Sequence, residues 1–204
     1  MEMIFLDKTF FEAMKERRTV YTIGGGSPVS DERIEEAVGQ AVQNVPSAFN
    51  SQSARAVLLF GKAHKRLWGI VMESLRKIVP AQSFGKTEVK INSFAAGHGT
   101  VLYFDDTDTT ESLMRQFPAY RDNFTVWAQQ SNGMLQFAVW TMLEQEGLGA
   151  SLQHYNPLID SGVKAAWNLP QNWKLIAEMP FGEPTGEPGP KDFLPLEKRL
   201  VTFR

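Results

Sequence analysis

The longest periodic segment of the chain runs from about Ala119 to Glu146 and predicts one long helix. Its apolar and small residues recur every three to four positions, and they are Phe124, Trp127, Ser131, Met134, Leu135, Ala138, Val139, Met142 and Leu143. A stripe this wide, with few charges inside it, is typical of a helix covered on most of its sides. We therefore expect this helix in the middle of the fold or of a dimer, with Gly147 and Gly149 ending it.

Shorter helices and strands are predicted around this helix. Helices are expected from a cap at Asp7 or Thr9 to about Arg17, after a cap at Ser30, over 62–77, and over 157–167 with Pro157 in the first turn. Strands are expected at 55–60, 99–104 and 173–179. Because 204 residues suit one core and no repeat or linker divides them, residues 1–204 are expected to form a single α+β domain.

The last 24 residues, Phe181 to Arg204, have a different composition. Four prolines and three glycines predict no regular structure before about Leu196. An apolar and basic segment, Leu196 to Arg204, then ends the chain. These features indicate an extended arm, which either embraces a second subunit or wraps around its own domain.

Charge and cysteine content exclude several classes of function. A net charge of -2 indicates neither a nucleic-acid partner nor an anionic membrane surface. The absence of cysteine rules out disulfides, iron–sulfur clusters and thiolate zinc sites. The three histidines lack a carboxylate pattern around them, so no metal site is expected. No segment resembles a signal peptide or a membrane span, and we expect a cytoplasmic protein.

The triplet Arg17-Arg18-Thr19 follows the first predicted helix. Two guanidiniums and a hydroxyl within three residues make a good grip for an anion, because arginine forms bidentate, charge-assisted hydrogen bonds with phosphate. A basic helix end that complements the helix dipole would have the same sequence.

Two further segments could face a flat ligand. The segment from Pro46 to Arg55, directly before a predicted strand, is dense in small hydroxyl and amide side chains: Ser47, Asn50, Ser51, Gln52 and Ser53. Such a loop suits a ring with carbonyls and imines, or it is a plain turn. In Gly147 to Tyr155 the glycines let the backbone approach a ring that Leu152 and His154 could border.

Two other motifs are not expected to be sites. Gly24 to Gly26 lacks the Lys-Ser/Thr of a phosphate loop and follows no clear strand, which favours a flexible turn. Asp105, Asp106 and Asp108 lack the glycine and glutamate of a calcium loop, which favours a solvated turn.

Five segments in this order resemble the nitroreductase superfamily, in its type II branch linked to fatty-acid repression and nitroquinoline reduction. They are ERRTVY (16–21), PSAFNSQSARAVLLFG (46–61), GHGTVLYFDD (97–106), FPAYRDNFTVWAQQSNGMLQF (117–137) and GLGASLQHYNPLID (147–160). Together they span nearly the whole chain. The resemblance implies a nitroreductase-like fold, with a central mixed, mainly antiparallel sheet flanked by helices. It also implies a homodimer with an exchanged C-terminal arm (181–204).

The resemblance further implies two shared sites for flavin mononucleotide (FMN). Arg17 and Arg18, with Thr19 beside them, would grip its phosphate, together with Arg199 rather than Lys198. Ser47, Phe49, Asn50 and Gln52 would reach the same flavin from the partner subunit. Leu152, Gln153 and His154 would border the reactive ring nitrogen, where better-known members carry a Pro-Glu-Gly segment; details of donor specificity are therefore not transferred. Phe49, Tyr120, Phe124 and Trp127 are candidates for a wall beside a small aromatic acceptor.

The implied reaction transfers hydride from NADH or NADPH through the flavin to a nitro-aromatic or quinone-like acceptor, by ping-pong kinetics and without a catalytic side chain. This agrees with the lack of any acid–base or nucleophile motif. The alternatives are a flavin-binding regulatory or stress-response protein with incidental reductase activity, and a cofactor-free interaction domain. The residues select neither the physiological acceptor, nor NADH against NADPH, nor two- against four-electron reduction.

Overall fold

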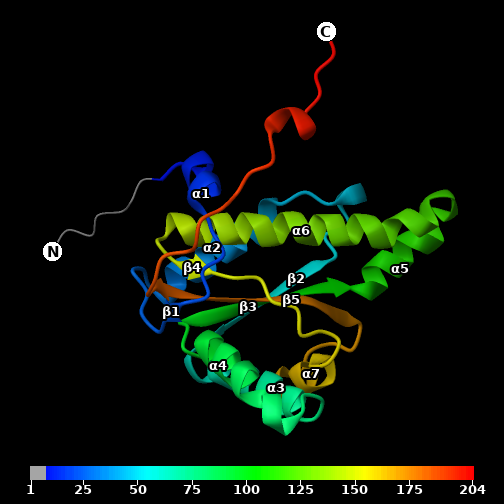
Figure 1. Ribbon diagram of the computed structural model, residues 1–204. Coiled ribbons are helices and arrows are strands. Elements are labelled where there is room, and N and C mark those ends of the chain that lie inside the picture. The colour runs from blue at the N-terminus through cyan, green and yellow to red at the C-terminus, as the bar shows by residue number, and fades with distance from the viewer. Residues whose placement is uncertain (1–7) are drawn as a thin grey trace.

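A central antiparallel sheet with helices on both faces forms the body of the protein (Figure 1). The computed structural model describes residues 8–204. In chain order its elements are α1 (Phe10–Glu16), β1 (Ile23–Gly24), α2 (Asp31–Asn44), β2 (Ala54–Phe60), α3 (Gly61–Arg76), α4 (Phe84–Ala95), β3 (Gly99–Asp106), α5 (Thr107–Gln116), α6 (Arg121–Gln145), β4 (Gly149–Ala150), α7 (Asp160–Trp167) and β5 (Trp173–Pro184).

The strands follow the order β1-β5-β3-β2, and β4 also pairs with β5. Every strand pair is antiparallel. The one parallel pairing in the part of the chain that the structure describes is an isolated bridge between Thr19 and Ala150. The expected mixed, mainly antiparallel sheet is therefore confirmed.

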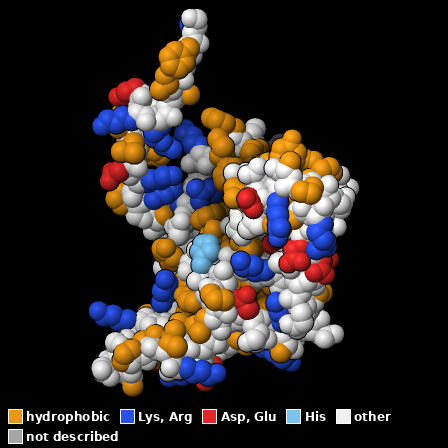
Figure 2. Space-filling view, turned by 90° about the vertical axis from the view of Figure 1, so that its right-hand side faces the viewer, with side chains coloured by type: hydrophobic (Ala, Val, Ile, Leu, Met, Phe, Trp, Pro, Cys, Tyr) orange, Lys and Arg blue, Asp and Glu red, His pale blue; other side chains and the backbone are white. Residues whose placement is uncertain are grey.

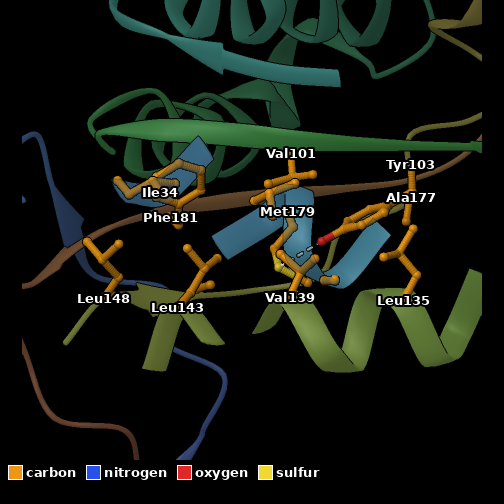
Figure 3. Packing of buried hydrophobic residues seen from close by; sticks show 13 residues of the cluster. Ile34, Val101, Tyr103, Leu135, Val139, Leu143, Leu148, Ala177, Met179 and Phe181 are labelled. Carbon is orange, nitrogen blue, oxygen red and sulfur yellow. Dashed lines mark hydrogen bonds between the residues drawn. The ribbon is translucent and has the colours of Figure 1, made fainter. Parts of the chain in front are cut away.

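Helix α6 packs along one face of the sheet, as its apolar stripe predicts (Figure 1). Leu135, Val139 and Leu143 point from α6 toward Val101 of β3 and Met179 of β5 (Figure 3). Helix α2 contributes to the same cluster. The side of α6 away from the sheet is only partly covered, since Val126, Met134 and Phe137 are exposed. One chain therefore covers less of this helix than its sequence predicts.

Helices α3, α4 and α7 cover the other face of the sheet (Figure 1). Trp68 of α3 and Phe94 of α4 lie at the centre of this second cluster, with ring centroids 5.0 Å apart. Trp68 Nε1 donates to Thr100 Oγ1 (3.1 Å), which gives the buried indole N–H a partner. Both faces of β3 are thus covered, and all eight of its residues are buried.

Several predicted element ends are confirmed by capping hydrogen bonds. The Thr9 side chain accepts from Glu12 N and forms a capping box, whereas the other candidate cap, Asp7, lies outside the described residues. Ser30 caps α2 by accepting from Arg33 N. Gly147 takes the left-handed backbone (φ 77°) that ends α6. The expected first turn at Pro157 is wrong, because residues 156–159 form a turn and α7 begins at Asp160.

Three further expectations need correction. Asp105 and Asp106 are not a solvated turn: they end β3 and are buried, and Asp106 caps α5, which the sequence did not reveal. Gly24 belongs to a short strand that pairs with Glu183 of β5. Regular structure also continues past Phe181, since β5 runs to Pro184.

The segment after β5 leaves the body as an arm, which we define as residues 185–204. From Lys191 to the end of the chain every residue is exposed. A single short turn, Leu196–Lys198, interrupts it. In Figure 1 the arm passes α6 and ends well above it. No helix in residues 8–204 is both long and apolar enough to cross a membrane.

Candidate active site

The arginine triplet lies beside the segment that follows α6. Thr19 forms a parallel bridge with Ala150, and Val20 N donates to Ala150 O (2.9 Å). In this parallel register Arg17 and Arg18 lie toward Leu148 and Gly149, and Val20 lies toward Ser151. The first and third sequence motifs, about 130 residues apart in the chain, are therefore neighbours in the fold.

The Arg17 guanidinium carbon lies 4.3 Å from the ring centroid of Trp140 on α6. Burial lowers the pKa of this guanidinium from its ordinary value, with Glu144 acting in the opposite direction. The group still stays charged at neutral pH, as arginine does in proteins. Its Nε is buried and has no partner among residues 8–204. A buried N–H donor without an acceptor is costly, so this atom is available to donate to an anion.

Arg18 extends toward the start of the arm, where its Nη2 donates to Gly189 O (2.6 Å). The two segments enclose a groove of about 360 Å³ lined by Arg18, Thr19, Tyr21, Glu187, Pro188 and Pro190, among others. Neither Arg17 nor Arg18 forms an ion pair within the described residues. Figure 2 shows Lys and Arg side chains gathered where the arm leaves the body. The groove therefore has positive charge available for an anion.

The segment from Leu152 to His154 runs along β5. Gln153 N donates to Glu178 O (2.7 Å), and Glu178 N donates to Gln153 O (2.9 Å). Gln153 is buried, Leu152 is half-buried and His154 is exposed. This pattern leaves Leu152 and His154 at the surface of the body, one residue on each side of the anchored Gln153.

The loop between α2 and β2 has a strained backbone. Phe49, Asn50 and Gln52 all have left-handed φ angles, of 57°, 50° and 49°. Such angles cost of order 1 kcal/mol for each residue that is not glycine, and they cluster at binding sites. Ser47 Oγ accepts from Gln52 N (2.9 Å) and holds the loop closed. Ser47 and Gln52 also line a cavity of about 270 Å³ against Ser131 and Leu135 of α6.

The Phe49 ring projects from this loop into a cluster of aromatic side chains. Its centroid lies 4.8 Å from Phe117, 5.4 Å from Phe124 and 5.9 Å from Trp127, with the Trp127 ring nearly parallel. Tyr120 lies 6.1 Å away. Because Phe49, Phe117 and Tyr120 remain exposed, the cluster forms a surface of rings on which a flat molecule can stack.

The structure does not bring all predicted site residues together in one chain. Phe49 packs on Trp127 and Arg17 packs on Trp140, and these tryptophans lie thirteen positions apart on α6, a distance of about 20 Å. Arg199 is exposed near the end of the arm. The arginine triplet and residues 152–154 are therefore one group, the loop residues Ser47 to Gln52 are a second, and Arg199 stands apart from both.

Sequence reasoning missed three residues at these places. Trp140 lies under Arg17, Phe117 completes the aromatic cluster, and Glu178 anchors residues 153–155. Of the three, only Glu178 could have been noticed in the sequence, because it is a carboxylate within the apolar predicted strand 173–179. The other two look like ordinary core aromatics.

Within residues 8–204, no cluster of three or more His, Asp or Glu side chains could hold a metal ion. The chemistry that these residues support is binding of an anion at the arginines and of flat rings at residues 152–154 and at the aromatic cluster.

Comparison with known proteins places the chain among nitroreductases. The model of the nitroreductase family matches residues 14–183. The nitroreductase FRM2 of Saccharomyces cerevisiae is 35% identical, over 91% of this chain and 93% of that protein. The nitroreductase CinD of Lactococcus lactis, solved with chloramphenicol and with 4-nitrophenol, is 39% identical over 96% of this chain and all of that one, with TM-scores of 0.87 and 0.86. A nitroreductase-like structure from Desulfovibrio desulfuricans in complex with FMN, 17% identical with a TM-score of 0.70, shares the fold.

Proposed function

The chain belongs to the nitroreductase family, and from this premise we propose that it is a homodimeric FMN-dependent enzyme. It takes hydride from NADH or NADPH and reduces nitro-aromatic or quinone-like acceptors. FMN-dependent redox chemistry is a general property of the family. The observation that carries the proposal for this chain is the pair Arg17 and Arg18, which directly precedes the bridge from Thr19 to Ala150 and has no carboxylate partner among residues 8–204.

The residues present fit FMN. The unpartnered Arg17 Nε and the Arg18 guanidinium suit its phosphate, because such pairs form short, charge-assisted hydrogen bonds. Thr19 would add a hydroxyl, and Arg199 a further positive charge from the arm. Leu152, Gln153 and His154 would border the ring, with Gln153 anchored to β5. When bound, FMN accepts a hydride and passes two electrons on.

A second copy of the chain would complete each site. The loop residues Ser47, Phe49, Asn50 and Gln52 lie about 20 Å along α6 from Arg17, so they would serve the flavin held mainly by the other subunit. Several apolar side chains without cover support such a dimer, among them Phe10 and Phe11 on α1 and Phe193, Leu194 and Phe203 on the arm. The exchanged arm, the single domain over 1–204 and the cytoplasmic location remain parts of this proposal.

The chain's own side chains would orient the reactants and exclude water. The rings of Phe49, Tyr120, Phe124 and Trp127 offer an apolar wall for a flat acceptor. Chloramphenicol and 4-nitrophenol, the ligands of the related CinD structures, both carry a flat nitrophenyl ring. Donor and acceptor would occupy the same place in turn, which gives ping-pong kinetics.

The visible spectrum of the purified protein tests the proposal first. We expect a yellow protein that NADH or NADPH bleaches without oxygen and that a nitro-aromatic acceptor then reoxidises. A colourless protein that does not take up added FMN would refute flavin binding. A yellow protein that neither donor bleaches would refute the reaction. Turnover no faster than that of free reduced flavin would favour a flavin-binding regulatory protein instead.

A further inference from the structure

Glu178 is a buried carboxyl on β5 that holds the segment expected to border the flavin. Its side chain has no exposed surface. Its backbone exchanges two hydrogen bonds with Gln153, and its Oε2 accepts from Tyr155 N (3.0 Å). Three hydrogen bonds from this one residue therefore fix the backbone of residues 153–155, and one of them depends on the carboxyl group.

The surroundings of this carboxyl contain acceptors without donors. Glu178 Oε1 is buried and has no partner among residues 8–204, and the same is true of Oδ1 of the nearby Asp160. No cation pairs with Glu178 in the described part of the chain. An ionised carboxylate in such a place is very costly, whereas a protonated one is neutral and can donate. The geometry therefore favours a carboxyl group that carries a proton.

We propose that Glu178 is a positioning residue, which holds residues 153–155 in place beside the flavin as long as its carboxyl is protonated. The proposal rests on the proposed function, because it requires residues 152–154 to border the ring. Loss of the proton would leave a buried charge without a cation and would release the segment toward water. The enzyme would then lose turnover through misplacement of Leu152 and His154, with the reacting groups themselves unchanged.

Burial and the neighbouring carboxyl of Asp160 both raise the pKa of Glu178, which favours its protonated form. Burial raises the pKa of Glu178 to about 8, and the nearby Asp160 of α7 raises it further, while the hydrogen bond from Tyr155 N lowers it. Burial also raises the pKa of Tyr155 to about 12, so this ring stays neutral. Lys164 and Lys174 face Asp160, and Tyr21 faces Tyr155; none of them pairs with Glu178.

The sign of the pH effect follows from this direction. When residues 153–155 are held against β5, Glu178 binds its proton more tightly than when these residues have moved away and its carboxyl has an ordinary pKa. The resulting stabilisation is complete below about pH 4.5, is lost as the pH rises, and is gone above about pH 8. Opening of residues 153–155 should therefore become easier with rising pH and then level off.

Hydrogen–deuterium exchange tests this without reference to turnover. We expect the protection of peptides covering 150–159, relative to the intrinsic amide rate at each pH, to fall by about 100-fold between about pH 5.5 and about pH 8.5. Glu178→Gln keeps an acceptor for Tyr155 N and stays neutral, so its protection should change less than about threefold over the same range. Glu183→Gln, the same change at an exposed site on the same strand, should behave as the unaltered protein.

Kinetics then connect the segment to the reaction. We expect kcat of the unaltered enzyme to fall as the pH rises toward about 8 and to level off above it, with KM for the acceptor unchanged, and the Glu178→Gln enzyme to lack this fall. Protection that does not depend on pH in the unaltered protein, or a dependence that Glu178→Gln retains, would overturn the proposal. Because the exchange is measured with or without flavin, a failure of flavin binding is seen separately, in the visible spectrum.

Discussion

Two leucines on the arm allow the proposed dimer to be tested quantitatively. Leu196 and Leu200 lie one turn apart, joined by a hydrogen bond from Leu200 N to Leu196 O (2.9 Å). They are 67% and 59% exposed. If the arm packs on a second subunit, these side chains become buried there. We therefore consider the double change Leu196→Ala and Leu200→Ala.

The size of the effect follows from the exposed fractions. Leucine exceeds alanine by three carbons, worth about 2 kcal/mol when fully buried, and about 60% of that is available here, so each change removes about 1.3 kcal/mol. Two positions in each of two arms give about 5 kcal/mol. Since about 1.4 kcal/mol corresponds to a factor of ten, the dissociation constant of the dimer should rise by between about 10³- and 10⁴-fold.

Sedimentation velocity over a range of protein concentrations measures this constant directly. Glu197→Ala on the same turn is the matched control, since it removes no exposed apolar side chain. The isolated subunit should stay folded, because both core clusters lie before residue 182. FMN retention should fall together with the dimer. A dimer of unchanged affinity in the double variant would refute the proposed packing of the arm on the partner.

Three further changes test the site and the fold. Arg17→Ala should weaken FMN binding about 10- to 100-fold in a fluorescence titration, since a charged hydrogen bond is worth about 1.5–3 kcal/mol. The control Arg115→Ala, at an exposed position, should leave FMN binding unchanged. An Arg17→Ala protein that binds FMN as tightly as the unaltered protein would remove Arg17 from the site. Trp127→Ala should raise KM for nitro-aromatic acceptors by about 3- to 10-fold through lost stacking, with FMN still retained; an unaltered KM would exclude this wall. Asp106→Ala should lower the free energy of unfolding in urea by about 3 kcal/mol, because Arg55 and Asn172 lose their acceptor. The control, Asp108→Ala at an exposed position, should lower it by well under 1 kcal/mol. Similar losses for both variants would contradict the pairing of Asp106 with Arg55 and Asn172.

The helices and strands with strong periodicity were predictable from the sequence. α2 and α6 show apolar residues at helical spacing, and β2 and β3 are short apolar runs of strand type. Helix α5 was missed because its residues, TDTTESLMRQ, are polar and follow an acidic stretch that is typical of a turn. Its cap, Asp106, is recognisable only once Arg55 and Asn172 are known to lie beside it.

The candidate site was predictable only in part, for a similar reason. The arginine triplet and residues 152–154 carry their chemistry in the sequence, and the resemblance to a family connected them. The stacking of Arg17 on Trp140 and the left-handed backbone at Phe49 arise from tertiary packing. The distance between Trp127 and Trp140 follows from the predicted helix, but no local pattern shows that Phe49 packs on one and Arg17 on the other.

That distance has a genetic consequence if the dimer is as proposed. Each site would take its arginines from one chain and its polar loop from the other, so a chain altered at Arg17 and a chain altered at Gln52 carry defects in different halves. In a mixed dimer of the two, one site receives both defects and the other receives none. Co-expression of two inactive variants should therefore complement, restoring about a quarter of the full activity when the chains pair at random.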